Sequence, residues 1–245
     1  MTRSTLWLPI FLLTIPCFNV NITVEKGGFF MTENEKMLAG KIYEPFNDEM
    51  VAQRSRAHEL SMKYNQTFEG DEEIRKEILD ELIPNRGEGV YLQGPIYFDF
   101  GINTVFGDRS YANFNLTVLD ICPVTIGHDV FMGPGVSLLT PLHPLCHEDR
   151  NPYFDEKMGR MTEREYGAPI TIGDNCWIAG NVTVCAGVTI GEGCVIGAGS
   201  VVTRDIPKNS LAVGNPCRVI RQITEADRLK NHPELFADDD FDQVK

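Results

Sequence analysis

A six-residue repeat of aliphatic residues limits the possible folds of this chain more than any other feature. The repeat consists of Ile172, Ile178, Val184, Ile190, Ile196 and Val202. All but one of the first five are followed directly by Gly or Ala. A sustained period of six is typical of a parallel β-helix, in which each hexad forms one short strand and one turn, and three hexads complete a triangular coil. We therefore predict a mainly β fold with the aliphatic side chains stacked in an interior column and small residues at crowded corners.

The same period is present earlier in the chain, after Gly89. The residues in phase there are Phe100, Phe106, Ala112 and Val118 and, after a slip of two residues, Ile126, Met132 and Leu138. We predict a solenoid over residues 89–222. Cys176 and Cys194 are eighteen residues apart, which is one full coil, so we expect them to stack on adjacent coils as two small buried residues.

The repeat is interrupted at residues 139–169. An interruption of this length cannot form part of a coil, so we expect an excursion loop that leaves the solenoid. Loops held by a rigid scaffold commonly carry functional residues. This loop contains three titratable residues suited to chemistry, His143, His147 and Glu165.

Residues 31–88 have a helical pattern instead. Thr32 and Glu35 have the spacing of a capping box, which marks the start of a helix. Two further helices are predicted over 48–64 and 71–82, because apolar residues recur there at helical spacing. The chain therefore divides into this helical segment, the solenoid and an acidic C-terminal tail at 223–245.

The first thirty residues have a different character. Residues 6–18 are strongly apolar and follow Arg3, as in a signal peptide, but no small-residue cleavage site follows. The stretch is short and interrupted by proline, which makes it a poor membrane helix. Translation from Met31 is a further interpretation. Two glycosylation sequons, at Asn115 and Asn181, lie inside the repeat, where a glycan would have little room. We predict a cytoplasmic protein with a dispensable extension at 1–30; a true signal or anchor is the alternative.

Charge and cysteine content exclude several classes of protein. The net charge of −13 is unsuited to binding nucleic acid, which requires a basic face. The acidic runs at 71–73 and 238–240 are expected to be solvated surface. Seven cysteines without regular spacing, and without a Cys-x-x-Cys pair, argue against a disulfide framework and a zinc ribbon. We predict free thiols and expect no metal.

Several sequence segments are more specific than the repeat. They are AGKIY (residues 39–43), YANFNLTVLD (111–120), VTIG (124–127), HP (143–144), PITIGDNCWIAG (169–180), VIGAGSVVTRDIP (195–207) and GNPCRVIR (214–221). With these segments the chain resembles the maltose/galactoside O-acetyltransferase family over about three quarters of its length. The resemblance implies a left-handed β-helix that assembles as a homotrimer with active sites at subunit boundaries. It also implies transfer of an acetyl group from acetyl-CoA to a sugar hydroxyl.

The resemblance assigns candidate residues for the transfer. A hydroxyl is a weak nucleophile until a base removes its proton, and a histidine suits that role. The family's catalytic histidine precedes a proline in the loop, which corresponds to His143, whereas His147 and His128 have no such correspondence. Glu165 matches a glutamate of the maltose-type members and is assigned to orient the base or to contact the acceptor.

The resemblance also suggests contacts for both substrates. Asp99 and Asn113 are the acceptor candidates, with Asp120 in addition, since the corresponding family carboxylate falls one residue later, at Ile121. The galactoside branch has an N-terminal Asp where this chain has Pro45, so the identity of the acceptor stays open. The acetyl-CoA candidates are Trp177, Gly180, Ala198, Thr203, Arg204, Arg218 and Arg221.

These residues indicate direct transfer, in which His143 deprotonates the sugar hydroxyl and a backbone amide near Gly180 stabilises the oxyanion. No cysteine lies where an acyl-enzyme would require it. Three alternatives stay open. One is a hexapeptide acetyltransferase with a non-sugar acceptor, and another is a carbonic-anhydrase-like metalloenzyme, which requires three converging histidines. The last is a non-catalytic solenoid subunit.

Overall fold

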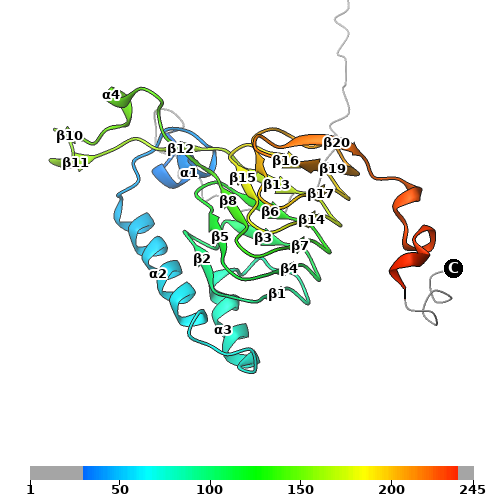
Figure 1. Cartoon of the computed structure of the whole chain (residues 1–245). Helices are drawn as coiled ribbons and strands as arrows, with labels where there is room; N and C mark the ends of the chain where they lie inside the picture. Colours follow the sequence, from blue (N-terminus) through cyan, green and yellow to red (C-terminus); the bar gives the residue numbers. More distant parts are fainter. Residues whose placement is uncertain (1–29, 237–245) are drawn as a thin grey trace, which may run out of the picture. The chain divides into compact units, whose positions relative to one another are not determined.

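The computed structural model describes residues 30–236. The chain divides into two compact units, residues 1–30 and residues 31–245, and the second is described here. The predicted hydrophobic extension at 1–30 lies outside the described residues except for Phe30, and so does the acidic run at 238–240. In the second unit, three helices precede a β-solenoid, as Figure 1 shows.

The solenoid has three faces, each built mainly of parallel strands, and the chain passes through them in the order A, B, C. Face A contains β1 (Tyr91–Leu92), β4 (Tyr111–Ala112), β7 (Phe131–Met132), β14 (Trp177–Ile178), β17 (Val195–Ile196) and β19 (Ser210–Val213), with β20 (Arg218–Gln222) antiparallel to β19. Face B contains β2 (Ile96–Phe98), β5 (Leu116–Leu119), β8 (Ser137–Leu139), β15 (Thr183–Cys185) and β18 (Val201–Val202). Face C contains β3 (Thr104–Phe106), β6 (Val124–Ile126), β13 (Ile170–Ile172) and β16 (Thr189–Ile190). The corners are named A/B, B/C and C/A after the faces that they join.

The predicted interior column is confirmed in the C-terminal coils. Ile178 pairs with Ile196 and Val184 pairs with Val202 on adjacent coils, and all four side chains are completely buried. The period of six places every third anchor on the same face, so each side chain packs on the equivalent one of the next coil. Cys176 and Cys194 are also buried, one position before the paired strands β14 and β17, and both are free thiols.

The prediction for the first coils is wrong at one position. Phe98, rather than Phe100, pairs with Val118 and belongs to the interior column. Each of the first two coils has two extra residues at the B/C corner, because eight residues separate Phe98 from Phe106, where six separate Val184 from Ile190. The extra residues push Phe100 out of the column into a second apolar cluster, which packs against the helical segment.

The helical segment contains α1 (Glu33–Leu38), α2 (Asp48–Tyr64) and α3 (Glu72–Leu82). Helices α2 and α3 lie at the end of the solenoid with β1 and β2, whereas α1 lies beside β12 (Tyr166–Gly167) (Figure 1). The capping box of Thr32 and Glu35 is present at α1. Tyr64 at the end of α2 lies in the main core and donates a hydrogen bond of 2.5 Å to the carbonyl of Leu92. The segment thus satisfies backbone groups that the first coil would otherwise leave unpaired.

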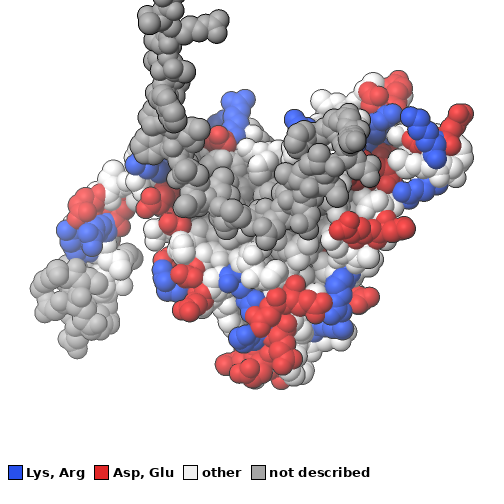
Figure 2. Space-filling view, turned by 180° about the vertical axis from the view of Figure 1, so that it is seen from behind, with Lys and Arg blue, Asp and Glu red and all other residues white. Residues whose placement is uncertain are grey.

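The acidic run at 71–73 is on the surface at the start of α3. Figure 2 shows acidic side chains gathered at this tip of the molecule, and Glu72 and Glu73 are exposed. This agrees with the predicted solvated surface. Across residues 30–236, we find no helix with the length and apolar character needed to cross a membrane.

Candidate active site

The excursion loop begins and ends in a short antiparallel ladder. β9 (Pro141–Leu142) pairs with β12 (Tyr166–Gly167), with Leu142 opposite Tyr166. One further step of the same register places His143 opposite Glu165. Directly opposed residues of an antiparallel pair have side chains on the same face. The structure therefore brings together the two loop residues selected from the sequence, with His143 Nε2 at 3.8 Å from Glu165 Oε1.

A third segment flanks Glu165 on its other side. Tyr43, from the chain between α1 and α2, forms an antiparallel bridge with Glu165, and its N–H donates a hydrogen bond of 3.0 Å to the Glu165 carbonyl. The Tyr43 hydroxyl donates to Glu165 Oε2. Tyr43 is only 3% exposed. The AGKIY segment contributes to the family resemblance, but nothing in its sequence indicates that its tyrosine contacts Glu165.

Burial and hydrogen bonding act in opposite directions on Glu165. Burial is the largest influence and raises the pKa of Glu165, and the charges of Asp99 and Glu163 raise it further. The hydrogen bond from Tyr43 and the proximity of His143 lower the pKa of Glu165. Burial, and then the charge of Glu165, raise the pKa of Tyr43 far above its usual value. The phenol therefore stays protonated and remains a donor to the carboxylate.

Asp99 lies beside this cluster, at the B/C corner directly after β2. Its Oδ1 is 3.4 Å from Nε2 of His58, which belongs to α2. Its charge influences both Glu165 and Tyr43, so it lies within electrostatic reach of the pair. The side chain of Asp99 is 19% exposed, which leaves its carboxylate accessible to a ligand at the surface.

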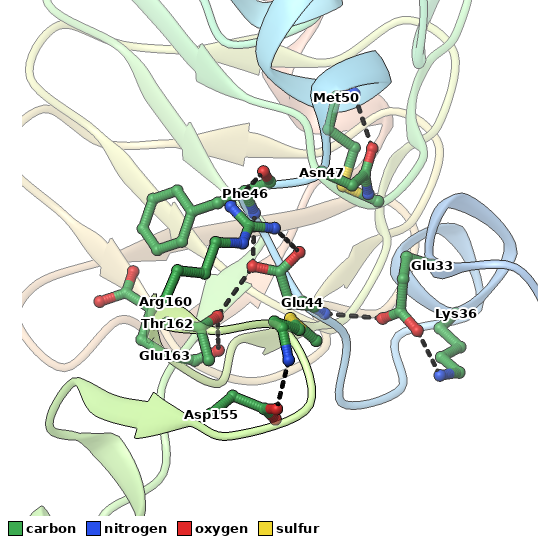
Figure 3. A network of polar contacts seen from close by, with 11 residues as sticks. Glu33, Lys36, Glu44, Phe46, Asn47, Met50, Asp155, Arg160, Thr162 and Glu163 are labelled. Atoms are coloured by element: carbon green, nitrogen blue, oxygen red, sulfur yellow. Dashed lines mark hydrogen bonds and ion pairs between the residues drawn. The ribbon is translucent and has the colours of Figure 1, made fainter.

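A polar network centred on Glu44 holds the outer part of the loop (Figure 3). The loop continues through α4 (His147–Arg150) into the hairpin of β10 (Tyr153–Asp155) and β11 (Arg160–Thr162). The almost buried Glu44 carboxylate accepts from the Thr162 hydroxyl at 2.8 Å and from the Arg160 guanidinium at 3.0 Å. Arg160 also donates to the carbonyl of Phe46 at 2.8 Å. Residues 43–46 therefore contact the loop at both Glu165 and the hairpin.

The geometry does not support Asp120 as an acceptor contact. Asp120 is completely buried, and its carboxylate accepts from the N–H groups of Phe100 and Gly101 and from the Thr104 hydroxyl. Its carbonyl accepts from Asn103. These contacts shape the widened B/C corner, and they leave the carboxylate without access to a ligand. Burial raises the pKa of Asp120 to about 6.

The remaining acceptor candidate and part of the donor set occupy the A/B corner. Asn113 directly follows β4 there, and its N–H donates to the carbonyl of Met132 at 2.9 Å. Gly180 and Ala198 have matching positions on adjacent coils, because Trp177 pairs with Val195 in register. Ala198 is exposed, and so is Trp177 on the outer side of face A, where it is 55% exposed. No contact in residues 30–236 joins Asn113 to His143.

Trp177 belongs to an apolar column on the outside of face A. The strand register places Tyr91, Tyr111, Phe131 and Trp177 on successive coils. Tyr91 stacks on Tyr111 with parallel rings, and Phe131 is 54% exposed. An exposed apolar column of this kind commonly marks an interaction surface.

The other donor candidates do not form one patch. Thr203 and Arg204 follow β18 at the B/C corner and are exposed. Arg218 and Arg221 lie on β20. The Arg221 guanidinium makes two hydrogen bonds with Asp227, of 2.6 and 2.9 Å, and Arg218 donates to the carbonyl of Cys217.

The histidines that a metalloenzyme would require lie at different corners of the solenoid. His128 is at the C/A corner, where its Nδ1 accepts from the N–H of Asp108. His143 is on the loop at the B/C corner. Residues 30–236 contain no group of three His, Cys, Asp or Glu side chains that could hold a metal ion.

Comparisons with known proteins agree with this architecture. Residues 36–87 match the maltose acetyltransferase hexapeptide capping motif, and residues 169–204 match six repeats of the bacterial transferase hexapeptide. The galactoside O-acetyltransferase of Escherichia coli K12 is 41% identical over 81% of this chain and 93% of its own length. A putative acetyltransferase of Dictyostelium discoideum is 42% identical over 79% of this chain and 95% of its own length.

Two solved structures extend the likeness to the fold. A maltose O-acetyltransferase from Clostridium difficile 630 has a TM-score of 0.72 and 42% identity, over 80% of this chain and 99% of its own. A galactoside acetyltransferase in complex with coenzyme A has a TM-score of 0.72 and 39% identity, over 81% of this chain and 94% of its own. The predicted fold class, a left-handed parallel β-helix with an N-terminal helical segment and an excursion loop, is confirmed.

Proposed function

The chain belongs to the maltose and galactoside O-acetyltransferase family, and from this premise we propose that it transfers an acetyl group from acetyl-CoA to a hydroxyl of a sugar. The observation that carries the proposal is the pairing of His143 with the largely buried Glu165. A base must be oriented by a partner on its other ring nitrogen, and a carboxylate held on rigid backbone performs that role.

In the proposed reaction, one ring nitrogen of His143 takes the proton of the acceptor hydroxyl while Glu165 holds the other. The hydroxyl oxygen attacks the thioester carbonyl directly and forms a tetrahedral oxyanion. A backbone N–H near Gly180 stabilises the oxyanion. When the intermediate collapses, the carbon–sulfur bond breaks, CoA leaves as a thiol after protonation by His143, and the acceptor leaves as an ester.

The acceptor binds beside the base in this proposal. Asp99 is the carboxylate that accepts hydrogen bonds from sugar hydroxyls, since it is partly exposed and its charge reaches Glu165. Asn113 supplies an amide that can donate and accept. Asp120 takes no part, because its carboxylate is already fully bonded within the corner.

The donor binds along the coils of the A/B corner. The exposed Trp177 ring flanks the pantetheine arm, and the small residues Gly180 and Ala198 leave their amides open to it. The phosphate end of CoA extends beyond the A/B corner, to Thr203 and Arg204 after β18 and to Arg218 and Arg221 on β20; the three guanidinium groups are favoured partners of phosphate.

These two halves of the site lie at different corners, which supports a homotrimer as the active form. His143, Glu165 and Asp99 are at the B/C corner, whereas Asn113, Gly180 and Ala198 are at the A/B corner. A neighbouring subunit can bring its A/B corner against the B/C corner of this one. Association also covers the apolar column on face A, and cyclic assembly gives one such boundary per subunit.

The decisive experiment is a panel of acceptors incubated with acetyl-CoA, with release of the free CoA thiol as readout. The panel contains maltose, glucose, a galactoside, serine and chloramphenicol. We expect thiol release with at least one sugar and its loss in His143→Ala. Turnover with serine or chloramphenicol, but with no sugar, would show that the acceptor is not a sugar. Binding of acetyl-CoA without turnover on any acceptor would contradict the transferase proposal.

Mixed oligomers test whether subunits share the site. His143→Ala and Asn113→Ala chains are each expected to be almost inactive alone. In a random mixture of the two chains, about a quarter of the boundaries combine one intact His143 with one intact Asn113. Activity should therefore return to about a quarter of the wild-type value. A mixture as inactive as its components would place both residues in a site within one subunit.

A cytoplasmic location is part of the proposal. What supports it is that the described cysteines, among them the closely stacked Cys176 and Cys194, are free thiols, as in reducing compartments. Mass spectrometry of the native N-terminus checks it. A mature chain that has lost its first residues by cleavage and carries glycans on its sequons would contradict a cytoplasmic location.

A further inference from the structure

We propose that Tyr43, in the segment between α1 and α2, is a positioning residue that keeps the Glu165 carboxylate ionised and directed at His143. This inference rests on the proposed function, since it assigns a role within the same acid–base site. It gives the N-terminal helical segment a part in the chemistry, beyond closing one end of the solenoid.

The backbone brings the three side chains together. Glu165 lies between two antiparallel neighbours, with Tyr43 on one side and the extension of β9 that carries His143 on the other. Three adjacent segments therefore present Tyr43, Glu165 and His143 in one row. Because neighbouring residues across an antiparallel ladder have their side chains on the same face, the carboxylate lies between the phenol and the imidazole.

The two carboxylate oxygens of Glu165 have different partners. Oε2 of Glu165 accepts from the Tyr43 hydroxyl, while Oε1 faces His143 at 3.8 Å. A hydrogen bond to one oxygen fixes the rotation of the carboxylate, and the second oxygen is then fixed with it. Tyr43 is itself held by its backbone bridge and by the apolar cluster that it forms with Met37 and Phe100. The phenol is therefore a rigid support for the carboxylate.

The Tyr43 hydroxyl also acts on the charge of Glu165. Glu165 is buried beside two other acidic side chains, Asp99 and Glu163, which all favour its neutral form. A neutral carboxyl group could not stabilise the imidazolium that forms when His143 takes a proton. The Tyr43 hydrogen bond opposes this effect, because a donor to the charged form favours that form. Tyr43 thus offsets part of the cost of keeping the largely buried Glu165 carboxylate ionised.

A further observation separates this role from simple attachment of the loop. The loop is also fixed at the Glu44 network, through Thr162 and Arg160 (Figure 3). These contacts hold the hairpin independently of the Tyr43 hydroxyl. Removal of that hydroxyl should therefore leave the loop in place and change mainly the electrostatics of Glu165.

The direct test is the titration of Glu165 in Tyr43→Phe, measured by NMR on protein with glutamate labelled at the carboxyl carbon. The Glu165 signal is assigned by its absence in Glu165→Gln. Loss of a hydrogen bond to a charged group should raise the pKa of Glu165 by about one to two units. This measurement needs no substrate, so it tests the link between Tyr43 and Glu165 even if no acceptor is found.

The kinetic test is the pH profile of kcat/KM for the acceptor. We expect the acid limb of Tyr43→Phe to move to higher pH, because Glu165 becomes protonated sooner as the pH falls. We also expect kcat to fall about tenfold, with KM for acetyl-CoA unchanged, since Tyr43 acts on the base. In Glu165→Gln, the further change Tyr43→Phe should leave the profile unaltered.

Tyr64→Phe is the matched control. Tyr64 belongs to the same helical segment, is as buried as Tyr43, and donates its hydroxyl to a backbone carbonyl instead of a carboxylate. Its loss should lower thermal stability to a similar extent without a shift of the acid limb. Equal pH profiles and equal Glu165 titrations in wild type and Tyr43→Phe would overturn the inference while the transferase activity stands. Absence of turnover on every acceptor would instead remove the proposed function.

Discussion

Two corners of the same solenoid differ in almost every physical property. The A/B corner keeps its coils uninterrupted, and its turns carry small residues such as Gly180 and Ala198. The B/C corner is widened by two residues in the first coils and then opens into the excursion loop. The first corner is exposed and beside an apolar column, whereas the second has the buried carboxylate of Asp120 and the largely buried one of Glu165.

The difference has a structural cause. A coil with regular hexads has room only for small polar side chains such as Ser200, because its interior is filled by stacked aliphatic residues. The extra residues at the B/C corner move the backbone outward. The helical segment packs against this corner, with Met37 and Met50 in one apolar cluster with Phe100. The buried carboxylate of Asp120 and the largely buried one of Glu165 both lie at this corner. The regular corner is suited to a long ligand that lies across several coils.

The largest expected effect concerns the loop at the B/C corner. His143→Ala should reduce kcat by about 100- to 10,000-fold, the usual contribution of a general base, with acetyl-CoA binding unchanged. Turnover by thiol release and donor binding by calorimetry measure the two effects separately.

His147→Ala is the control for this loss, because His147 lies in the same loop, is exposed, and contacts only the neighbouring exposed Glu148 among the described ion pairs. Its activity should match wild type. Equal activity in His143→Ala and wild type would remove the base from the proposed reaction. A loss of acetyl-CoA binding in His143→Ala would instead assign this loop to the donor half.

The regular half of the molecule could be predicted from sequence because its physics is local and periodic. The column from Ile172 to Val202, the loop limits and the helix over 48–64 follow from spacing alone. The widened corner could not be predicted in the same way, since the six-residue phase assigned Phe100 to the interior. The two extra residues shift that phase, and only the packing of Phe100 against Met37 and Met50 resolves it.

The contacts of the candidate active site could likewise be predicted from the sequence only in part. His143 and Glu165 were selected from the resemblance, and their opposition depends on a ladder whose strands are two residues long. The contact of Tyr43 with Glu165 joins positions 122 residues apart, and no pattern within either segment reveals it. The assignment of Asp120 to the acceptor came from correspondence with a family position, whereas its burial depends on three donors that the corner brings together.

The second prediction tests whether the carboxylate at the widened corner is structural. The pKa of Asp120 in the folded protein is about 6, above its ordinary value of 3.8. The folded state therefore binds this proton more tightly than the unfolded state. The resulting stability is complete below about pH 4 and is lost as the pH rises to about 6, by about 3 kcal/mol.

Asp120→Asn should remove this dependence, because the amide oxygen can still accept from Phe100 and Gly101, while the amide nitrogen donates to the Thr104 hydroxyl instead of accepting from it, and the amide does not titrate. Urea unfolding at pH 4.5 and pH 7 should then give more similar free energies in the variant than in wild type, and KM for the acceptor should stay the same. A large rise in acceptor KM with unchanged stability would return Asp120 to the acceptor site.

The smallest effect is expected at the regular corner. Ala198→Leu should raise KM for acetyl-CoA about tenfold, which corresponds to about 1.4 kcal/mol, because the larger side chain covers the amides beside Gly180. Ala198 is exposed, so the melting temperature and kcat should hardly change. Thr189→Leu, an exposed position on face C, adds a leucine away from both corners and should leave KM unaltered. A fall in kcat at constant KM in Ala198→Leu would show that the A/B corner acts on the reacting groups. The assignment of donor binding to this corner and of the chemistry to the B/C corner would then be wrong.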